Sequence, residues 1–552
     1  MITLLDYGAG NVRSVRNAVL KLGYEIREVN EPADILQAEK LIFPGVGNFG
    51  SAMESLQKRG WLAPLLQYLQ AGRPYLGICL GLQTLFEAST EAPGVAGLGL
   101  IKGVIQRFGT PDGVAGDSFP LAVPQIGWNG LAPRQDSPLL ADCRQEKFYF
   151  VHSYRAAASP ENCDWVLAET TYGEDFISAV QRGAVAACQF HPEKSGPAGL
   201  ALLGNFLRAE KLAVTKRPAS PGKERLPAGA LFPRAATRPA KRIIACLDVR
   251  NNDQGDLVVT KGDQYDVREA GHGAVRNLGK PVELAERYYH EGADEITFLN
   301  ITAFRDFPLE DQPMLEVLER ASERIFVPLT IGGGIREFTD AHGRFYSALE
   351  VAARYFRAGA DKISIGSDAV AVVEDYLARG RQKDGKSSLE QIAHLYGSQA
   401  VVISIDPRRV YVSGPAAAPG KQVIPTAFPG PAGEEYCWYQ CTVKGGREGR
   451  DLDAATLAAA CQELGAGEIL LNCIDKDGTN SGFDHELIKM VKEAVTIPVI
   501  ASSGAGKPEH FSEVFIATGA EAALAAGIFH RREVEIGEVK QHLKRHGIEV
   551  RG

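Results

Sequence analysis

The sequence predicts two α/β domains in one chain, the second of them a barrel of eight parallel strands alternating with helices. Three observations support this prediction. Short apolar runs alternate with helix-like segments up to about residue 210. Eight further strand-like runs follow from about residue 241, and we expect the extra length of this half to lie in polar or Pro/Gly-rich insertions such as 408–433. A basic, proline-rich stretch separates the two series, so we expect domains at 1–210 and 241–552 joined by a linker at 211–240.

Length and composition limit the possible classes of protein. At 552 residues the chain is too long for one hydrophobic core. The net charge of −8 argues against nucleic acid as the main partner. No apolar run approaches the roughly 20 residues that span a bilayer, so we expect no membrane partner. The N-terminus leads at once into a predicted strand, which predicts a cytoplasmic protein without a signal peptide.

The nine cysteines are scattered along the chain. Cys437 and Cys441 form the closest pair, and no second pair or His-rich segment follows to complete a zinc site. We therefore expect buried thiols rather than a zinc site. Cys79 is the exception, because of its surroundings in the sequence.

The segment between the domains holds five prolines and seven basic residues against one acidic residue, without apolar periodicity. Such a composition cannot bury enough surface to fold alone, so we interpret it as a linker. A site for an anionic partner is the alternative. Before the linker, the predicted strands are ITLLDY, KLIFPGVG, YLGICLG, FYFVHSY and VAACQFHPE. After it, they are RIIACLDV, EITFLNI, VPLTIGGGI, KISIGS, AVVISID, EILLNCID, IPVIASSGAG and AALAAGIF.

The second series repeats itself. GADEITFLNIT resembles GAGEILLNCID, which places Glu295 against Glu468, and VPLTIGGGI resembles IPVIASSGAG at nearly the same spacing. IACLDV and VISIDP likewise place Asp248 against Asp406. The repeat predicts two half-barrels of four βα units each, so the function should also have two-fold character.

A cysteine stands at a predicted strand–turn–helix junction in the first domain. In YLGICLGLQT, Cys79 ends the apolar run and is flanked by Gly77 and Gly81. Small flanking residues permit the tight turn of a nucleophile elbow, and the backbone N–H of Leu80 can stabilise an oxyanion. A buried structural thiol is the alternative for this string alone.

A histidine and a carboxylate follow a later strand, in VAACQFHPEKSG. We expect Glu193 to lie on the same side of an extended segment as His191 and to orient it as a base. Alone, His191 would be an ordinary loop histidine. Combined with the cysteine elbow, the segment resembles the class I glutamine amidotransferases, and FPGVGNFG at 43–50 resembles their glycine-rich oxyanion strand.

That resemblance implies a flavodoxin-like α/β fold and a mechanism for the first domain. Cys79 attacks the glutamine side-chain amide, His191 protonates the departing ammonia, and Glu193 orients His191. The backbone of Val46, Gly47 and Leu80 holds the oxyanion, and the side chain of Gln83 contacts glutamine.

Two aspartates end strands of the predicted barrel. Asp248 follows strand one and Asp406 follows strand five, and active sites of such barrels lie at the C-terminal ends of strands. Two carboxylates on opposite half-barrels can divide acid and base roles; capping a helix is the alternative for either one. Glycine clusters at Ile331–Gly334 and Ser502–Gly506 predict two phosphate sites, or simply tight turns.

Taken over the whole chain, the motifs resemble the imidazole glycerol phosphate synthase family in its fused, fungal and plant form. DYGAGN, PQIGWN, FVHSYR and QFHPEKSG resemble its glutaminase, and KRIIACLDV, TKGDQ, LTIGGGI, DGTNSGFD, IASSGAGK and ALAAGIFH its TIM-barrel cyclase. The resemblance implies that ammonia from glutamine enters the barrel. There a bisphosphorylated ribulosyl-formimino-aminoimidazole carboxamide ribonucleotide is converted to imidazole glycerol phosphate and aminoimidazole carboxamide ribonucleotide in histidine biosynthesis. This chemistry implies no metal and no cofactor.

The family also implies roles for further residues. The catalytic residues of the barrel would be Asp248 and Asp406. The residues that would contact the phosphates are Lys261, Gly333, Gly334, Ser367, Asp477, Gly478, Ser503, Gly504, Ala526 and Gly527. A gate for ammonia would be formed by Arg242, Glu295, Lys362 and Glu468; in another barrel these four residues would be interpreted as a stabilising layer of ion pairs. The domain interface includes Trp128, Lys194 and Asp361. Asn300, Gly366 and Gly527 differ from the residues of the bacterial pattern, so the resemblance does not predict the detailed phosphate contacts.

Three other interpretations are weighed against this one. A glutaminase could serve a purine or anthranilate synthase, but those lack a two-fold barrel with two phosphate clusters. The sister isomerase of the histidine pathway needs neither ammonia nor the charged quartet. A metabolite-binding scaffold would tolerate loss of the catalytic residues, and all are present. We expect a monomer that carries both activities.

Overall fold

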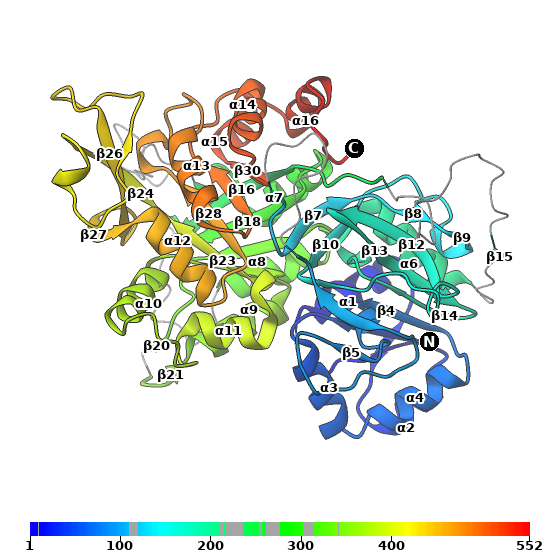
Figure 1. Ribbon diagram of the computed structural model, residues 1–552. Coiled ribbons are helices and arrows are strands. Elements are labelled where there is room, and N and C mark those ends of the chain that lie inside the picture. Colours follow the sequence, from blue (N-terminus) through cyan, green and yellow to red (C-terminus); the bar gives the residue numbers. More distant parts are fainter. Residues whose placement is uncertain are drawn as a thin grey trace.

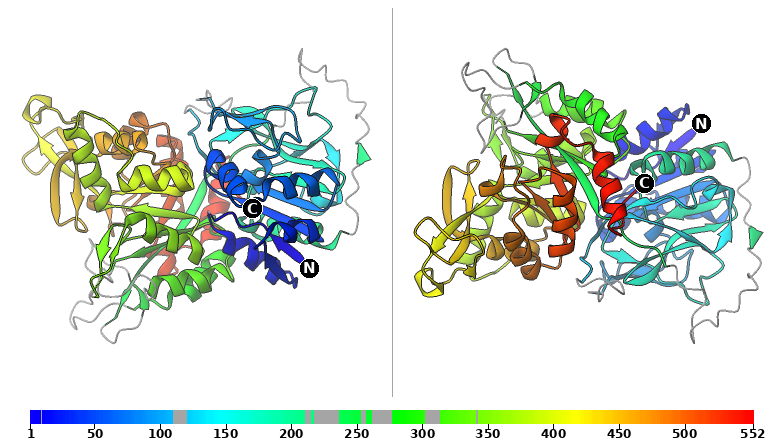
Figure 2. Two further views of the ribbon diagram at one scale, coloured as in Figure 1. Left: turned by 90° about the horizontal axis from the view of Figure 1, so that it is seen from below. Right: turned by 90° about the horizontal axis from the view of Figure 1, so that it is seen from above.

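A computed structural model of the chain describes residues 1–8, 10–109, 120–209, 215–216, 236–252, 257–260, 277–301, 313–340 and 342–552. The N-terminal α/β domain and the barrel lie side by side, which all three views of the ribbon show (Figures 1 and 2). No helix in the described part of the chain is long and apolar enough to cross a membrane.

An eight-stranded sheet forms the centre of the N-terminal domain, in the order β2-β1-β3-β4-β14-β13-β12-β8. The first five strands in this order run parallel and the last three pair antiparallel. The strands are β1 (Ile2–Leu4), β2 (Ile26–Glu28), β3 (Lys40–Gly45), β4 (Tyr75–Cys79), β8 (Ala132–Pro133), β12 (Val166–Tyr172), β13 (Glu174–Arg182) and β14 (Val185–Cys188).

Helices cover both faces of this sheet, with one apolar core on each face. They are α1 (Val12–Lys21), α2 (Pro32–Gln37), α3 (Phe49–Lys58), α4 (Leu62–Gln70), α5 (Leu80–Gln83) and α6 (Gly196–Arg208). Strand β4 is buried along its whole length between β3 and β14. This explains its unbroken apolar run, since a parallel strand covered on both faces has no polar side. The strand therefore fixes the position of its last residue, Cys79, at the C-terminal end of a central strand of the sheet.

Eight parallel strands close into a barrel, as the sequence predicts. Their order is β16-β18-β19-β22-β23-β28-β29-β30, and β30 pairs back to β16. The strands are β16 (Arg242–Asn251), β18 (Glu295–Asn300), β19 (Leu329–Gly332), β22 (Lys362–Ile365), β23 (Val401–Ile405), β28 (Glu468–Asn472), β29 (Val499–Ser502) and β30 (Ala522–Ala525). A ninth strand, β17 (Leu257–Thr260), pairs antiparallel with β16.

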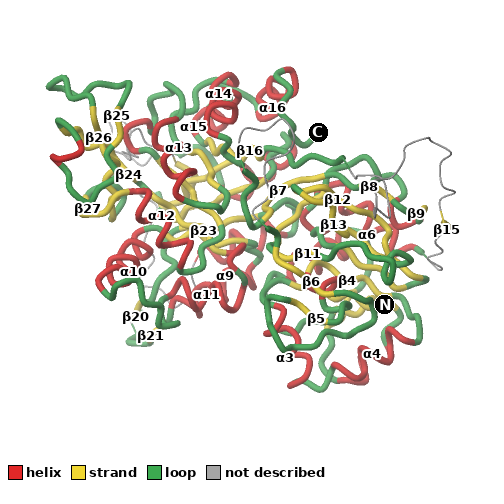
Figure 3. Tube along the Cα trace, in the orientation of Figure 1, coloured by secondary structure: helices red, strands yellow, loops and turns green. Residues whose placement is uncertain are grey.

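Helices surround the barrel strands (Figure 3). They are α7 (Pro281–His290), α8 (Pro313–Ser322), α9 (Ala348–Ala358), α10 (Ser367–Ala378), α11 (Ser388–Tyr396), α12 (Ala454–Glu463), α13 (His485–Ala494), α14 (Pro508–Thr518), α15 (Gly527–His530) and α16 (Ile536–Arg545). Capping residues stabilise the first turns of two of these helices: Ser347 and Glu350 form a capping box on α9, and Asp453 caps α12.

A small antiparallel sheet projects from the barrel after the fifth strand, at one end of the molecule in Figure 1. It contains β24 (Pro407–Val412), β25 (Ile424–Pro425), β26 (Tyr436–Val443) and β27 (Glu448–Asp453). The sequence predicts an insertion at 408–433, and the structure extends it to Asp453. The difference arises because β26 pairs with both β24 and β27 and so belongs to the inserted sheet rather than to the barrel.

Two further strands of the N-terminal domain face the barrel. Strands β7 (Gln125–Asn129) and β10 (Phe148–His152) pair with each other, and their Trp128 and Tyr149 side chains belong to the apolar core of the barrel. This β7–β10 ribbon is therefore one of the parts of the first domain that reach the barrel. Within the predicted linker, β15 (Thr215–Lys216) pairs with β9 (Gln135–Asp136) of the N-terminal domain.

Candidate active sites

Cys79 has the strained backbone of a nucleophile elbow. Its φ is +54°, a value that non-glycine residues rarely adopt, and α5 begins at the next residue. The flanking glycines are needed sterically. A Cβ on Gly77 would lie 2.5 Å from the carbonyl oxygen of Gly81, and one on Gly81 would lie 2.2 Å from that of Phe43. The predicted strand–turn–helix is present.

His191 and Glu193 form a buried pair, with Nδ1 of His191 2.8 Å from Oε1 of Glu193. Burial opposes the charged imidazolium, but the Glu193 carboxylate and the neighbouring Cys79 outweigh it and raise the pKa of His191 well above its ordinary value. Nε2 of His191 makes no hydrogen bond within the described residues. This nitrogen is the one left for proton transfer beside the cysteine.

The backbone between His191 and Glu193 differs from the prediction. His191 is extended, but Pro192–Lys194 forms a 3-10 turn rather than continuing the strand. In an extended segment, residues two apart do share a face, yet here the turn is what brings the carboxylate against Nδ1. Proline at the first position of the turn has the φ that the turn requires.

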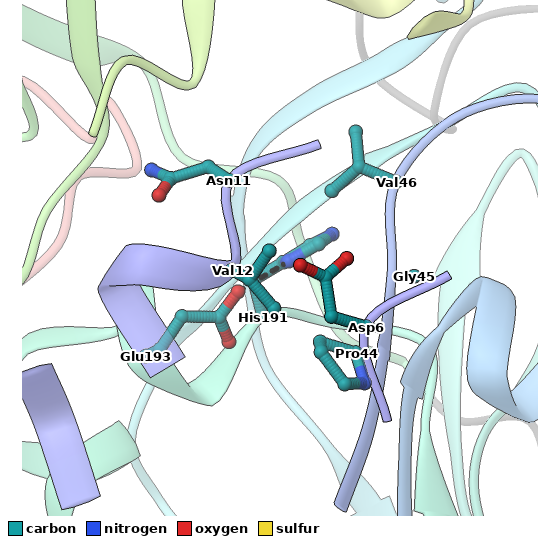
Figure 4. A pocket seen from close by; sticks show the side chains of 8 residues that line it. All are labelled: Asp6, Asn11, Val12, Pro44, Gly45, Val46, His191 and Glu193. Carbon is teal, nitrogen blue, oxygen red and sulfur yellow. Dashed lines mark hydrogen bonds and ion pairs between the residues drawn. The ribbon is translucent and has the colours of Figure 1, made fainter. Parts of the chain in front are cut away.

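A small pocket lies between the end of β3, the start of α1 and the His191 turn (Figure 4). It is lined by Asp6, Asn11, Val12, Pro44, Gly45, Val46, His191 and Glu193. Gly45 pairs with Cys79, so the Val46–Gly47 loop follows directly beside the elbow. Burial raises the pKa of Asp6, although a hydrogen bond from the Gly8 N–H opposes the shift. Asp6 and Asn11 belong to the DYGAGN motif but were not predicted as site residues, and both line this pocket.

Two glutamine side chains connect to the nucleophile. Nε2 of Gln83 donates to Oε1 of Gln189 at 3.1 Å and to the carbonyl of Tyr154 at 3.0 Å. Nε2 of Gln189 in turn lies 3.4 Å from Sγ of Cys79. Gln189 was not predicted as a site residue, although it lies directly after β14 and two residues before His191.

Asp248 and Asp406 stand at the same end of the barrel. Asp248 lies near the end of β16 and Asp406 directly follows β23, four strands further around the barrel. Both are partly exposed at this end. Burial of its carboxyl group raises the pKa of Asp406, as does Asp477, whereas hydrogen bonds from Asn472 and Ser404 lower it. The two predicted catalytic carboxylates therefore share one mouth.

The predicted phosphate-binding residues fall into two groups on opposite sides of this mouth. Gly333, Gly334 and Ser367 follow the neighbouring strands β19 and β22. Asp477, Gly478, Ser503, Gly504, Ala526 and Gly527 follow β28, β29 and β30. Lys261 lies outside the described residues.

The glycine turns in both groups have backbone conformations that suit close approach. Gly333 has φ +89°, and a Cβ there would lie 2.0 Å from the carbonyl oxygen of Asn300. Gly504 has φ +98°, and a Cβ there would lie 2.2 Å from that of Gly482. Ser503 adopts φ +71° although it is not glycine. Turns of this kind present backbone N–H groups to anions, so their conformation is compatible with the predicted phosphate sites.

Four charged side chains close a ring at the opposite end of the barrel. Arg242 pairs with Glu295 at 2.8 Å and also with Glu468. Lys362 lies 2.6 Å from both glutamates. All four side chains are at most 1% exposed. The predicted quartet is thus a continuous ring of alternating charge.

The N-terminal domain covers this ring. A Cβ on Gly127 would lie 3.6 Å from Cδ of Arg242. Burial raises the pKa of Tyr149 well above its ordinary value, with Glu295 adding to the shift and Arg242 opposing it. The carbonyl of Tyr149 accepts a hydrogen bond from the backbone N–H of His191 at 2.8 Å. Tyr149 therefore contacts the backbone of His191 and lies within electrostatic reach of the charged ring.

The predicted interface residues also meet across the domains. Nζ of Lys194 lies 2.6 Å from Oδ2 of Asp361, and Nδ2 of Asn11 donates to Oδ1 of the same carboxylate at 2.9 Å. Nε1 of Trp128 donates to the carbonyl of Asp294 at 3.2 Å, and the guanidinium of Arg551 stacks 4.3 Å from the Trp128 ring. Asp361 directly precedes Lys362 of the charged ring, so the interface joins both sites.

Comparisons with known proteins agree with both halves. A model of class-I glutamine amidotransferases matches residues 3–209, and one described as "Histidine biosynthesis protein" matches residues 242–535. The chain is 60% identical over 552 residues to "Imidazole glycerol phosphate synthase hisHF, chloroplastic" of Arabidopsis thaliana, covering all of this chain and 89% of that protein.

Two other relatives show the extent of the match. The hisHF protein of Schizosaccharomyces pombe is 52% identical over 560 residues, covering all of both chains. The HisF subunit of Methanobrevibacter smithii is 42% identical over 311 residues, covering 56% of this chain and 98% of the subunit. The chain therefore belongs to the fused imidazole glycerol phosphate synthase hisHF family, enzymes that join a glutamine amidotransferase to a HisF-type cyclase.

Proposed function

We propose that Cys79, His191 and Glu193 hydrolyse glutamine in the N-terminal domain. The thiolate attacks the side-chain amide carbon, and the C–N bond breaks as His191 gives a proton to the departing ammonia. Water then hydrolyses the glutamyl thioester and restores the thiol. Glu193 holds His191 through Nδ1, which leaves Nε2 for this transfer. The backbone of Val46, Gly47 and Leu80 would stabilise the oxyanion, and Gln83 would contact glutamine.

We further propose that Asp248 and Asp406 carry the cyclisation of the bisphosphorylated nucleotide. Ammonia adds to the ribulosyl carbonyl, and the carboxylates move protons during C–N cleavage and ring closure. The two groups of strand-end residues, with Lys261, would hold the two phosphates. Their places on opposite sides of the barrel mouth support this assignment, because the substrate carries one phosphate at each end.

The observation that carries the proposal is the covered ring of Arg242, Glu295, Lys362 and Glu468. It separates the glutaminase residues from the barrel interior, and it is buried beneath the β7–β10 ribbon. Ammonia released to solvent would be protonated, so a route inside the protein is needed. We propose that ammonia passes from beside His191, past Tyr149, and through this ring when its ion pairs open.

One paired assay tests the proposal. Cys79→Ala should abolish glutamine-dependent formation of imidazole glycerol phosphate but retain turnover with an ammonium salt. Asp248→Asn and Asp406→Asn should abolish product formation with either nitrogen source. Glutamine-dependent synthesis that survives Cys79→Ala would refute the triad, and synthesis from ammonium that survives both aspartate variants would refute the barrel site.

We propose domain limits of 1–210 and 241–552, with 211–240 as the linker; the family-model matches at 3–209 and 242–535 support these limits. We also propose that the chain works as a monomer, since both sites lie on one chain, and that it works in the cytoplasm. The Arabidopsis relative is named chloroplastic, so the location is best tested by fractionating cells that express the tagged chain.

A further inference from the structure

The repeat places the two catalytic aspartates in equivalent positions but gives them different neighbours. Aligning IACLD with ISID puts Cys246 of the first half-barrel at the position of Ser404 in the second. Aligning EITFL with EILLN puts Leu299 at the position of Asn472. The second half-barrel is therefore polar at two positions beside its aspartate where the first carries a thiol and an alkyl group.

Asn472 contacts Asp406 directly. It is the last residue of β28, which pairs with β23, so it stands beside the residue that follows β23. Its Nδ2 donates to Oδ1 of Asp406 at 2.9 Å and to Oγ of Ser404 at 3.0 Å. An amide nitrogen has two N–H groups, and this arrangement uses both. The amide can therefore hold the carboxylate in a single orientation.

The equivalent place beside Asp248 is of a different character. Leu299 packs there against an apolar cluster that includes Cys246. The Cys246 thiol is 4.0 Å from Oδ1 of Asp248, and a thiol is a weaker donor than an amide. The two halves of the barrel therefore differ at the positions next to the two proposed catalytic aspartates.

We infer that Asn472 is a positioning residue for cyclisation, which orients the Asp406 carboxylate and makes its role differ from that of Asp248. The inference rests on the proposed function of Asp406. It gives a physical origin for dividing acid and base work between two residues that the repeat makes equivalent.

The groups around Asp406 determine what removal of the amide would do. Burial raises the pKa of Asp406 and Asp477 raises it further, whereas Asn472 and Ser404 lower it. Cys441, on β26 of the inserted sheet, also lies within electrostatic reach of the carboxylate. Without the Asn472 donor, burial and Asp477 act with less opposition. The limb of the pH–rate profile that reports the titration of Asp406 should then move to higher pH. The direction is the same whether catalysis requires the acid or the base form of Asp406.

The test compares three forms of the full-length enzyme with ammonium salt as nitrogen source. Asn472→Leu copies the residue of the first half-barrel, and Asn472→Asp keeps the shape but replaces the donor with a second carboxylate. We expect kcat to fall at least about tenfold in both, because positioned acid–base groups contribute roughly 10²–10⁴-fold. KM should change little. The limb of the pH–rate profile that reports Asp406 should move to higher pH in Asn472→Leu and to still higher pH in Asn472→Asp.

Two measurements keep the outcome decisive. The circular dichroism spectrum and thermal unfolding of each variant report whether the barrel is folded, and Asn472→Gln, which retains an amide donor, should recover part of the lost kcat. An unchanged limb and kcat in the Leu and Asp variants, or a rise in KM alone, would overturn the inference. Because Asp406→Asn tests the proposed function independently, an inactive Asp406→Asn enzyme beside normal Asn472 variants would refute only the positioning role.

Discussion

At the scale of single residues, the surroundings shift the pKa values of two buried histidines of the N-terminal domain in opposite directions. Burial lowers the pKa of His152 to about 3, and its hydrogen bond to the Tyr154 carbonyl only partly opposes this. His191 is equally buried, but the Glu193 carboxylate and Cys79 raise its pKa. A fixed negative partner therefore reverses the direction in which desolvation alone would shift the pKa of an imidazole.

Replacing Glu193 with Gln should reverse the shift at His191. With the carboxylate gone, burial is opposed less and the pKa of His191 should fall, and glutaminase kcat should fall roughly 10²–10⁴-fold. NMR titration of labelled histidines measures this, with the His191→Gln spectrum identifying the signal. His152 is the internal control and should stay neutral in both proteins. An unmoved His191 midpoint would contradict the assignment of Glu193 as its partner.

The sign of the accompanying stability change follows from the same shift. A histidine whose pKa is raised in the folded state stabilises the protein fully below its ordinary value of about 6.5. That contribution is lost as pH rises through the folded pKa. The stability advantage of the natural chain over Glu193→Gln should therefore be largest in mild acid and shrink above neutral pH.

At the scale of elements, the elbow depends on how closely α5 approaches β3. Gly81, in the first turn of α5, packs so near Phe43 of β3 that no side chain fits between them. Gly45 is under the same constraint, since a Cβ there would lie 2.4 Å from Cβ of Leu80. The strained φ of Cys79 persists because the strand on one side and the helix on the other are both held by buried packing.

Gly81→Ala should therefore damage glutaminase activity without harming the barrel. The new methyl must displace the β3 backbone, and a shift of about 1 Å at a nucleophile can cost roughly 10²-fold in rate. Cyclisation with ammonium salt should stay normal. Gly109→Ala is the matched control, because a Cβ there meets nothing within 4 Å. Equal glutaminase rates in the two variants would show that the close approach is unimportant.

At the scale of the whole molecule, one carboxylate of the barrel connects the two sites. Asp361 holds Lys194, which follows Glu193 in sequence, and Asn11, which lines the glutaminase pocket. It also precedes Lys362 of the charged ring. A second cross-domain ion pair, Arg13–Glu319, is much more exposed. The buried pair is therefore the better candidate for transmitting occupancy of the barrel to the glutaminase.

Lys194→Ala should weaken that coupling. We expect the stimulation of glutamine hydrolysis by bound nucleotide to fall at least about fivefold, the lower range of typical coupling energies. Cyclisation from ammonium should be unaffected. Glu319→Ala, which breaks the exposed pair, should leave stimulation nearly unchanged because exposed ion pairs contribute little. A greater loss of stimulation in Glu319→Ala than in Lys194→Ala would contradict this route.

The sequence by itself determined the architecture and most of the candidate site. Apolar runs marked all eight barrel strands, since parallel strands buried on both faces have unbroken apolar sequences. The internal repeat paired Asp248 with Asp406, and glycines beside Cys79 indicated a tight turn. Each of these signals is local, because it depends on the backbone or burial pattern of a few consecutive residues.

Only the tertiary structure decided which side chains meet. Gln189 reaches Cys79, Asn472 reaches Asp406, and Tyr149 lies between His191 and the charged ring. The turn that presents Glu193, and the extension of the insertion to Asp453, were likewise not predicted. These features depend on contacts between residues distant in sequence, where the direction of a side chain is set by neighbouring strands and by the other domain. An amide or hydroxyl carries no local sign of the partner that folding brings to it.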